Sequence, residues 1–261
     1  MVQMLKEIFE YRDLAWMLTL RDLRVRYKQA AMGFLWAVFM PIVAVCAGIL
    51  IKQAMAVVSH QSLNIRGIMS ISVRVLPWTF FISSIRFSVQ ALVGNTSLIT
   101  KIYFPRAILV LSSILACLFD FAIGSGVLVV LLTIFNVGLS LTLLWLPLLL
   151  LLLVLFTTGL GLILSCANLF YRDVKYIVEV ILMYGIFFTP VFYDANTFGR
   201  LKPFMLLNPI GSILEGINQV VVIHLAPDKF WTTYAALISV SIFILGMSIF
   251  HKNEHLFAEN I

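Results

Sequence analysis

Several charged side chains stand inside otherwise apolar stretches, and they are the first candidates for chemistry. Arg74, Arg86 and Asp120 are the clearest cases. If such a stretch crosses a bilayer, a charge near its centre costs at least about 2.5–3.5 kcal/mol, so each charge needs a partner or water. Two interpretations stay open. Either the arginines line a hydrated path for an anionic or hydroxyl-rich substrate, or they serve structure, through an ion pair with Asp120 or by reaching an interface.

Catalytic motifs are missing from the sequence. It has no GxxxxGK[ST] phosphate loop, no HExxH and no GxSxG, so it does not bind ATP in the P-loop manner. Gly124-Ser125-Gly126 has no nearby histidine, and small residues in an apolar helix favour close packing. Asp120, Glu179 and Glu215 are too far apart in sequence for an obvious acid–base pair. We therefore predict a protein that is not an enzyme, with a membrane transferase as the unsupported alternative.

The cysteines and histidines do not form a metal-binding pattern. Cys46, Cys117 and Cys166 each lie in an apolar stretch, without CxxC or Cys/His spacing. They are typical of small buried side chains. The four histidines are scattered along the chain. No metal or cofactor site is predicted in this chain.

The amino-acid composition indicates whether water or lipid surrounds these residues. Of the 261 residues, 62% are hydrophobic and 11% are charged, whereas a soluble domain carries about 25% charged residues. A bilayer-spanning helix needs about 20 apolar residues, and several runs reach that length. We predict an all-α membrane protein, with a cytoplasmic interface helix and basic segment at residues 1–30 and a six-span domain at residues 31–261.

The six predicted spans alternate with short connections. They are Met32–Ile51, Ile68–Val93, Ala107–Val137, Leu141–Leu169, Tyr176–Tyr193 and Phe230–Phe250. With the N-terminus inside, eleven of the 18 lysines and arginines fall on the cytoplasmic side and five on the outer side. Positive charge favours cytoplasmic connections. Both termini are therefore predicted to be cytoplasmic.

Two further segments are distinctive. Residues Gln3–Leu20 fit an amphipathic helix at the interface with Trp16 as an anchor, and the basic run Arg21–Lys28 follows. The connection Asp194–Asp228 is too apolar for a free loop and too rich in Pro and Gly for a span. Short re-entrant helices in the outer leaflet, shielded by protein, fit it best.

Seven sequence motifs together resemble the permease subunit of type-2 ABC exporters, in the branch that exports O-antigen, capsule or teichoic-acid polymers. They occur in the family's order along nearly the whole chain: RDLRVRYKQAAMGFLWAVFMP (Arg21–Pro41), LPWTFF (Leu76–Phe81), NTSLITKIYFPR (Asn95–Arg106), NLFYRDVKYIV (Asn168–Val178), TPVFY (Thr189–Tyr193), NP (Asn208-Pro209) and FAENI (Phe257–Ile261). Members of this family translocate lipid-linked polysaccharide across the bacterial inner membrane. The resemblance implies a homodimer bound to two copies of an ATPase subunit that carries the ATP and Mg²⁺.

The resemblance also implies roles for particular residues. Coupling to the ATPase would fall to Asn95, Leu98, Lys101, Tyr103, Phe104 and Pro105. The substrate path would be lined by Trp36, Trp78, Phe81, Arg86, Tyr184 and Phe188. The lipid pyrophosphate would meet Arg21, Arg24, Arg26 and Lys28, since guanidinium forks suit phosphate oxygens, although plain positive-inside anchoring explains this cluster equally well.

Two features depart from the family pattern. The family often carries an arginine about ten residues after its NP pair, but Asn218 stands there, with Glu215 close by. Arg74 is not expected from the pattern, so its role stays open. A small-molecule exporter of the same superfamily, a membrane enzyme acting on polyprenyl lipids and a channel-forming protein remain the alternatives.

Overall fold

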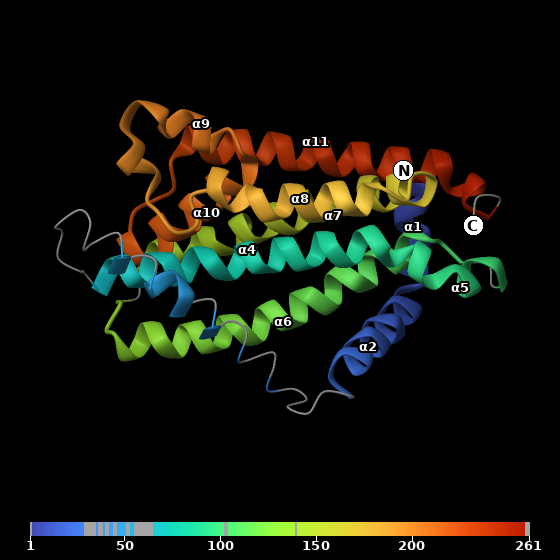
Figure 1. Ribbon diagram of the computed structural model, residues 1–261, viewed down its shortest axis with the longest axis horizontal. Coiled ribbons are helices and arrows are strands. Elements are labelled where there is room, and N and C mark those ends of the chain that lie inside the picture. The colour runs from blue at the N-terminus through green and yellow to red at the C-terminus, as the bar shows by residue number, and fades with distance from the viewer. Residues whose placement is uncertain are drawn as a thin grey trace.

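A computed structural model of the chain describes residues 2–28, 35, 39, 42–43, 46–50, 53–54, 65–101, 104–138 and 140–258. Over these residues the regular structure is entirely helical (Figure 1). Most of the first predicted span, Met32–Ile51, lies outside the described residues, as do Trp36 and Tyr103. The prediction of an all-α protein is confirmed.

From α4 onward, the described helices follow one another with short connections. In chain order they are α1 (Val2–Glu10), α2 (Arg12–Lys28), α4 (Ile65–Ala91), η1 (Val93–Asn95), α5 (Thr96–Lys101), α6 (Ala107–Ile134), η2 (Leu141–Trp145), α7 (Leu146–Phe170), α8 (Val174–Gly185), η3 (Ile186–Phe188), η4 (Ala195–Leu201), α9 (Lys202–Leu206), α10 (Pro209–Asn218), η5 (Gln219–Ile223), α11 (Lys229–Asn253) and η6 (Glu254–Ala258). The N-terminal region differs from the prediction. It forms two helices that meet at Tyr11, and the second continues through the basic run to Lys28.

Four of the described helical stretches are long and apolar enough to cross a membrane. They are α4, α6, the combined η2 and α7, and α11, which match the second, third, fourth and sixth predicted spans. The fifth predicted span, Tyr176–Tyr193, is shorter than expected. Its helix α8 has 12 residues, about 18 Å at 1.5 Å per residue, against a hydrocarbon core of about 30 Å.

Proline explains where the helical stretch of α8 and η3 stops. η3 ends at Phe188, and the backbone of the next residue, Thr189, is extended, with φ −120° and ψ 132°. The next residue is Pro190, and a residue before proline is disfavoured in the helical region. The chain therefore leaves the helix there and enters the segment Asp194–Asp228.

Helix α4 is the central helix of the bundle. Most of its apolar window is buried, whereas only a minority of that of α6 and of α11 is buried. α6 packs chiefly on α4 and α2, and α11 packs chiefly on α7 (Figure 1). Gly159 and Gly246 lie where α7 and α11 cross, and a Cβ on either would collide with the backbone of the other helix. Glycine is needed at this crossing because the two backbones are in contact.

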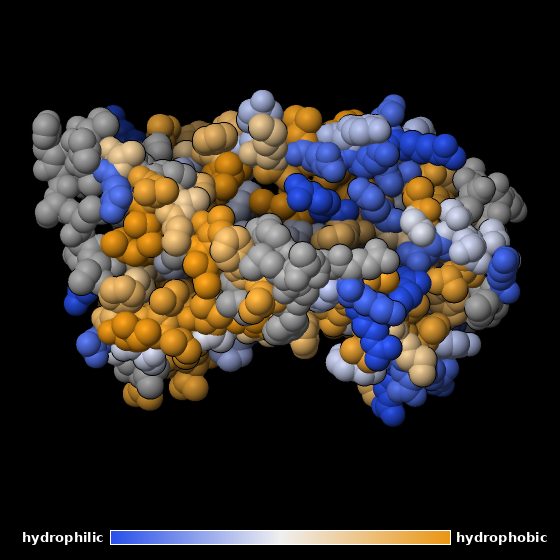
Figure 2. All heavy atoms as spheres, turned by 60° about the horizontal axis from the view of Figure 1, so that its bottom comes forward, coloured by the Kyte–Doolittle hydropathy of each residue, from blue (hydrophilic) through white to orange (hydrophobic). Residues whose placement is uncertain are grey.

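The two ends of the bundle differ in polarity. Both termini and α5 lie at one end, and α9 lies at the other (Figure 1). Hydrophilic side chains gather towards the end that carries α2, and apolar side chains dominate much of the remaining visible surface (Figure 2). The broad apolar surface is typical of a chain solvated by lipid.

Local capping fixes the start of α10 and joins two of the sequence motifs. The Asn208 side chain accepts a hydrogen bond from the backbone N–H of Ile210, and Pro209 occupies the first helical turn. This is the preferred chemistry of a helix N-terminus. The Asn208 amide also donates to the Thr189 hydroxyl at 2.9 Å. The NP motif therefore holds α10 against the TPVFY motif.

Candidate functional site

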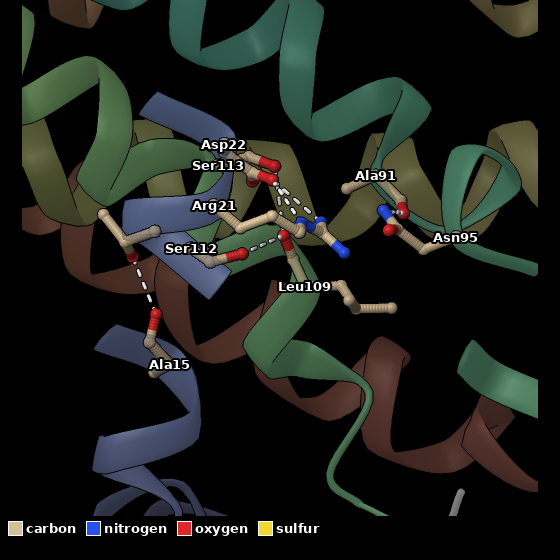
Figure 3. Close-up of polar contacts among 9 residues, drawn as sticks. Ala15, Arg21, Asp22, Ala91, Asn95, Leu109, Ser112 and Ser113 are labelled. Carbon is tan, nitrogen blue, oxygen red and sulfur yellow. Dashed lines mark hydrogen bonds and ion pairs between the residues drawn. The ribbon is translucent and has the colours of Figure 1, made fainter. Parts of the chain in front are cut away.

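The predicted coupling residues form a short helical connection between α4 and α6. The Asn95 amide donates to the Ala91 carbonyl at 2.9 Å and so binds one of the last carbonyls of α4 (Figure 3). Lys101 is exposed at the end of α5, while Phe104 and Pro105 are buried where the chain enters α6. Leu98 is half-buried. The segment thus presents Lys101 outward and is anchored by Phe104.

The basic run on α2 divides between two faces of the helix. Arg21, Arg24 and Lys28 line one cavity of about 530 Å³ together with apolar residues of the same helix. They are spaced three and four residues apart and therefore share one face. Arg21 also pairs with Asp22 at 2.8 Å (Figure 3). This open face of α2 combines three cations with the apolar side chains of Met17, Leu20 and Val25, which suits a ligand with an anionic head and a hydrocarbon tail.

Arg26 points away from that cavity. Its guanidinium donates to Asp120 at 2.9 Å and to the Cys117 sulfur at 3.6 Å, both on α6. It also lies 3.8 Å from the centroid of the Phe87 ring on α4, a cation–π contact. We call Arg26, Tyr27, Phe87, Cys117 and Asp120 the Arg26 cluster. It ties α2 to both α4 and α6, and Asp120 pairs with Arg26 rather than with Arg74 or Arg86.

Tyr27 completes the Arg26 cluster. Its hydroxyl donates to the second carboxylate oxygen of Asp120 at 2.5 Å. Burial and this hydrogen bond raise the pKa of Tyr27 above its ordinary value, because the ionised phenol would be desolvated and would face a carboxylate. Tyr27 therefore stays a donor at neutral pH, and both oxygens of Asp120 are engaged.

Arg74 is held by a second cluster near the other end of the bundle. Its guanidinium donates to Asp194 at 2.6 Å, to Glu215 at 3.0 Å and to the Tyr193 carbonyl at 3.1 Å. The Arg74 side chain is 1% exposed and that of Glu215 is 5% exposed, whereas that of Asp194 is 43% exposed. We call Arg74, Asp194 and Glu215 the Arg74 triad. It joins α4 to α10 and to the chain that leads into η4.

The Arg74 triad accounts for Arg74 and Glu215, two of the residues that depart from the family pattern, but it does not include Asn218. Glu215 is an acid on an apolar helix and Arg74 is a base on another, and each needs an opposite charge. The pairing was missed because the two residues are 141 positions apart. Charge complementarity was the available signal, but Asp120 was considered as the partner instead.

The residues predicted for the substrate path do not lie together within one chain. Trp78 and Phe81 are buried and their ring centroids are 5.7 Å apart, so they pack in the core beneath α8. Tyr184 and Phe188 are exposed on α8 and η3, and Arg86 is exposed on α4. The structure therefore separates a buried aromatic pair from an exposed aromatic surface.

The exposed surface of α8 and η3 runs along the length of both helices. Only Val178 and Leu182 of α8 are buried. The exposed apolar and aromatic side chains are Tyr176, Ile177, Val180, Ile181, Met183, Tyr184, Phe187 and Phe188. Exposed apolar surfaces of this extent mark contact with lipid or with another protein chain.

No metal centre is found among the described residues, since no three His, Cys, Asp or Glu side chains gather there.

Comparison with known proteins identifies the family. The family described as "ABC-2 type transporter" matches residues 13–222. An "O-antigen export system permease protein RfbA" of Myxococcus xanthus is 29% identical over 265 residues, covering all of both chains. A protein of the same name from Klebsiella pneumoniae is 28% identical over 252 residues, covering 95% of this chain and 94% of that one. The family match extends over most of the sequence, and four described stretches are fit to cross a membrane. The chain is therefore a multi-pass membrane protein that belongs to the ABC-2 type transporter family.

Proposed function

We propose that the chain is the permease subunit of an ATP-driven exporter that carries lipid-linked polysaccharide, with O-antigen as the substrate, across the bacterial inner membrane. The observation that carries this proposal is the end-to-end similarity to proteins named O-antigen export system permeases. The sequence has no phosphate loop, so nucleotide hydrolysis belongs to a separate subunit.

The proposed assembly is a homodimer with two ATPase subunits. The exposed surface of α8 and η3 supports it, because eight large apolar or aromatic side chains there are exposed in the single chain and are available to a second copy. Two copies facing each other would place Tyr184 and Phe188 along a shared conduit. Aromatic rings on such a wall offer apolar faces to sugar rings, which are themselves amphipathic. Trp78 and Phe81 would support this wall from behind.

The proposed topology keeps six spans and both termini in the cytoplasm. The end of the bundle with the termini, α2 and α5 is hydrophilic, as expected for the cytoplasmic side (Figure 2). The opposite end carries a helix pair, Gly199–Leu206 and Pro209–Ile223, bent by 113°. We assign this pair to the outer leaflet as a re-entrant element. Its polar backbone is shielded there by α4 and α11, against which α10 packs.

The cytoplasmic end offers two surfaces with different roles. α5, with Lys101 exposed at its end, is the proposed contact for the ATPase. The α2 cavity lined by Arg21, Arg24 and Lys28 is the proposed contact for the lipid pyrophosphate. Arg26 is excluded from this second role, because its guanidinium is engaged by Asp120.

The test is export by the reconstituted complex. The chain would be co-expressed with its ATPase in a host that lacks its own O-antigen permease, and surface O-antigen would be measured. Restored surface polymer that requires ATP hydrolysis supports the proposal. Polymer retained inside, with export of small amphiphiles instead, would favour the small-molecule exporter, and lipid-modifying turnover by the chain alone would favour the enzyme.

A charge reversal tests the coupling surface within the same assay. Lys101→Glu should abolish export and uncouple the ATPase while the complex still inserts, because the side chain is exposed and supports no core contact. Wild-type export by this variant would remove α5 as the coupling element. Lys252→Glu, also exposed at the end of α11, is the matched control and should export normally.

A further inference from the structure

The C-terminal helix η6 folds back onto the start of α6. The Glu254 carboxylate accepts a hydrogen bond from the backbone N–H of Arg106 at 2.8 Å. The Arg106 guanidinium in turn donates to the Glu254 carbonyl. These two reciprocal bonds join residues that are 148 positions apart.

Glu254 supplies a helix cap that α6 does not carry itself. Arg106 is the N-cap residue of α6, and its own side chain makes no capping bond. The first N–H groups of a helix lack internal partners, and a carboxylate near them also opposes the positive end of the helix dipole. In an ordinary capping box, a glutamate within the same helix bonds to the N-cap N–H. Here the C-terminal segment provides that glutamate.

Phe257 holds the same segment in place by packing. It is fully buried, and its ring meets Phe250 edge-on at 5.0 Å and Phe170 at 6.2 Å. The Arg106 guanidinium lies 5.9 Å from its centroid. Phe257 therefore sits among the end of α7, the end of α11 and the start of α6.

This arrangement adds a direct link between η6, at the end of α11, and the start of α6. It supplements the packing of α7 on α4 and on α6, which already joins the helices of the bundle. α6 packs chiefly on α4 and α2, whereas α11 packs chiefly on α7. Arg106 directly follows Pro105, the last residue of the coupling segment. The contacts of Arg106, Glu254 and Phe257, which we call the C-terminal clasp, thus lie where the coupling segment joins α6.

We infer that the C-terminal clasp positions the coupling segment and makes the α7–α11 pair move together with α6 when the ATPase displaces it. The inference rests on the proposed function, because it takes Asn95–Pro105 as the ATPase contact. Glu254 and Phe257 are positioning residues in this scheme and touch neither polymer nor nucleotide.

The experiment compares paired variants in the intact complex in membrane vesicles. Three quantities are measured: the amount of complex, ATP hydrolysis and polymer export per complex. Glu254→Ala removes the cap, and export per complex should fall about tenfold while ATP hydrolysis continues. Glu254→Gln keeps an acceptor in the same place and should restore most of the export. Phe257→Ala should uncouple in the same way, and Lys252→Ala should leave all three quantities unchanged.

Each other outcome contradicts the clasp in a recognisable way. Equal losses in Glu254→Ala and Glu254→Gln would show that the hydrogen bond is not what matters. A loss of complex with unchanged export per complex, in both Glu254→Ala and Phe257→Ala, would reduce the segment to a purely structural role. Failure of the proposed function looks different, since the unmodified complex would then export no polymer and Lys101→Glu would have no effect.

Discussion

The Arg26 cluster and the Arg74 triad both bury an arginine, but they do so in opposite ways. In the triad the Arg74 side chain is 1% exposed and faces two carboxylates, so the site carries excess negative charge. In the cluster the side chains of Arg26 and Asp120 are 19% and 30% exposed, and one cation meets one anion with a phenol and a ring around them.

The two sites differ in the free energy that is lost when one partner is removed. Removing one partner from a deeply buried pair leaves an uncompensated charge, which is far more costly than loss of a pair that water can reach. The Arg74 triad is therefore a fixed attachment of α10 to α4, with Asp194 as its accessible part. The Arg26 cluster is an attachment of α2 that water can partly replace. The Arg74 triad, at the end we assign to the outer side, is therefore the more costly of the two attachments to break.

The largest effect is expected for Arg74→Ala. This change leaves the Glu215 carboxylate buried without its positive partner. The free energy of unfolding should fall by about 3–5 kcal/mol. Thermal unfolding of the purified protein in detergent measures it. The double variant Arg74→Met with Glu215→Met should recover much of the loss, because it removes both buried charges. If Arg74→Ala is no less stable than Arg26→Ala, the ranking of the two sites is wrong.

A smaller effect is expected at the Arg26 cluster. Arg26→Ala should destabilise by about 1–2 kcal/mol, since Asp120 keeps Tyr27 and gains water. The loss should appear as earlier proteolysis of α2 rather than as global unfolding, because α2 packs mainly on α6. Arg24→Ala, a change of an exposed cation on the same helix, is the control and should leave the protease pattern as it is.

The pH dependence of the Arg26 cluster gives a still smaller and more specific signal. The pKa of Tyr27 is raised in the folded state above its ordinary value of about 10. Its contribution is therefore fully present below pH ~10 and is lost as the pH rises beyond that value. Tyr27→Phe should cost about 1 kcal/mol at neutral pH and show a weaker loss of stability between about pH 10 and 12. Identical alkaline profiles for both proteins would contradict the assignment.

The smallest stability effect is expected where the Arg74 triad reaches water. Asp194→Asn should cost less than about 1 kcal/mol, because this carboxylate is 43% exposed and an amide oxygen can still accept from Arg74. Glu215→Gln, measured beside it by thermal unfolding, should cost clearly more. A larger loss for Asp194→Asn than for Glu215→Gln would reverse the assignment of the accessible and the buried partner.

Sequence reasoning located most of the membrane helices because their signal is local. The apolar runs that became α4, α6, α7 and α11 agree with prediction at the level of a few residues. The predicted interface helix, Gln3–Leu20, ends eight residues before α2 does, because its amphipathic pattern does not extend into the basic run Arg21–Lys28. In the structure these charged residues continue α2 and are partly neutralised by Asp22 and Asp120.

The candidate sites show where local patterns fail. Four basic residues on α2 form one cluster in the sequence, yet helix geometry sends Arg26 to α6 and leaves Arg21, Arg24 and Lys28 at the cavity. Trp78 and Phe81 are as aromatic as Tyr184 and Phe188, but burial separates the two pairs. Aromaticity can be read from the sequence, whereas the face it occupies depends on which helices pack alongside.

The sequence by itself determined that this chain is a helical membrane protein, and its motifs predicted a permease that exports polymers rather than an enzyme. Those properties follow from composition, from local runs of apolar residues and from motifs a few residues long. Only the tertiary structure decided that Arg74 meets Glu215, that Arg26 meets Asp120 and that Glu254 caps α6. Each of these contacts joins residues more than ninety positions apart, and opposite charges in a low-dielectric bundle pair with whichever partner the packing brings near.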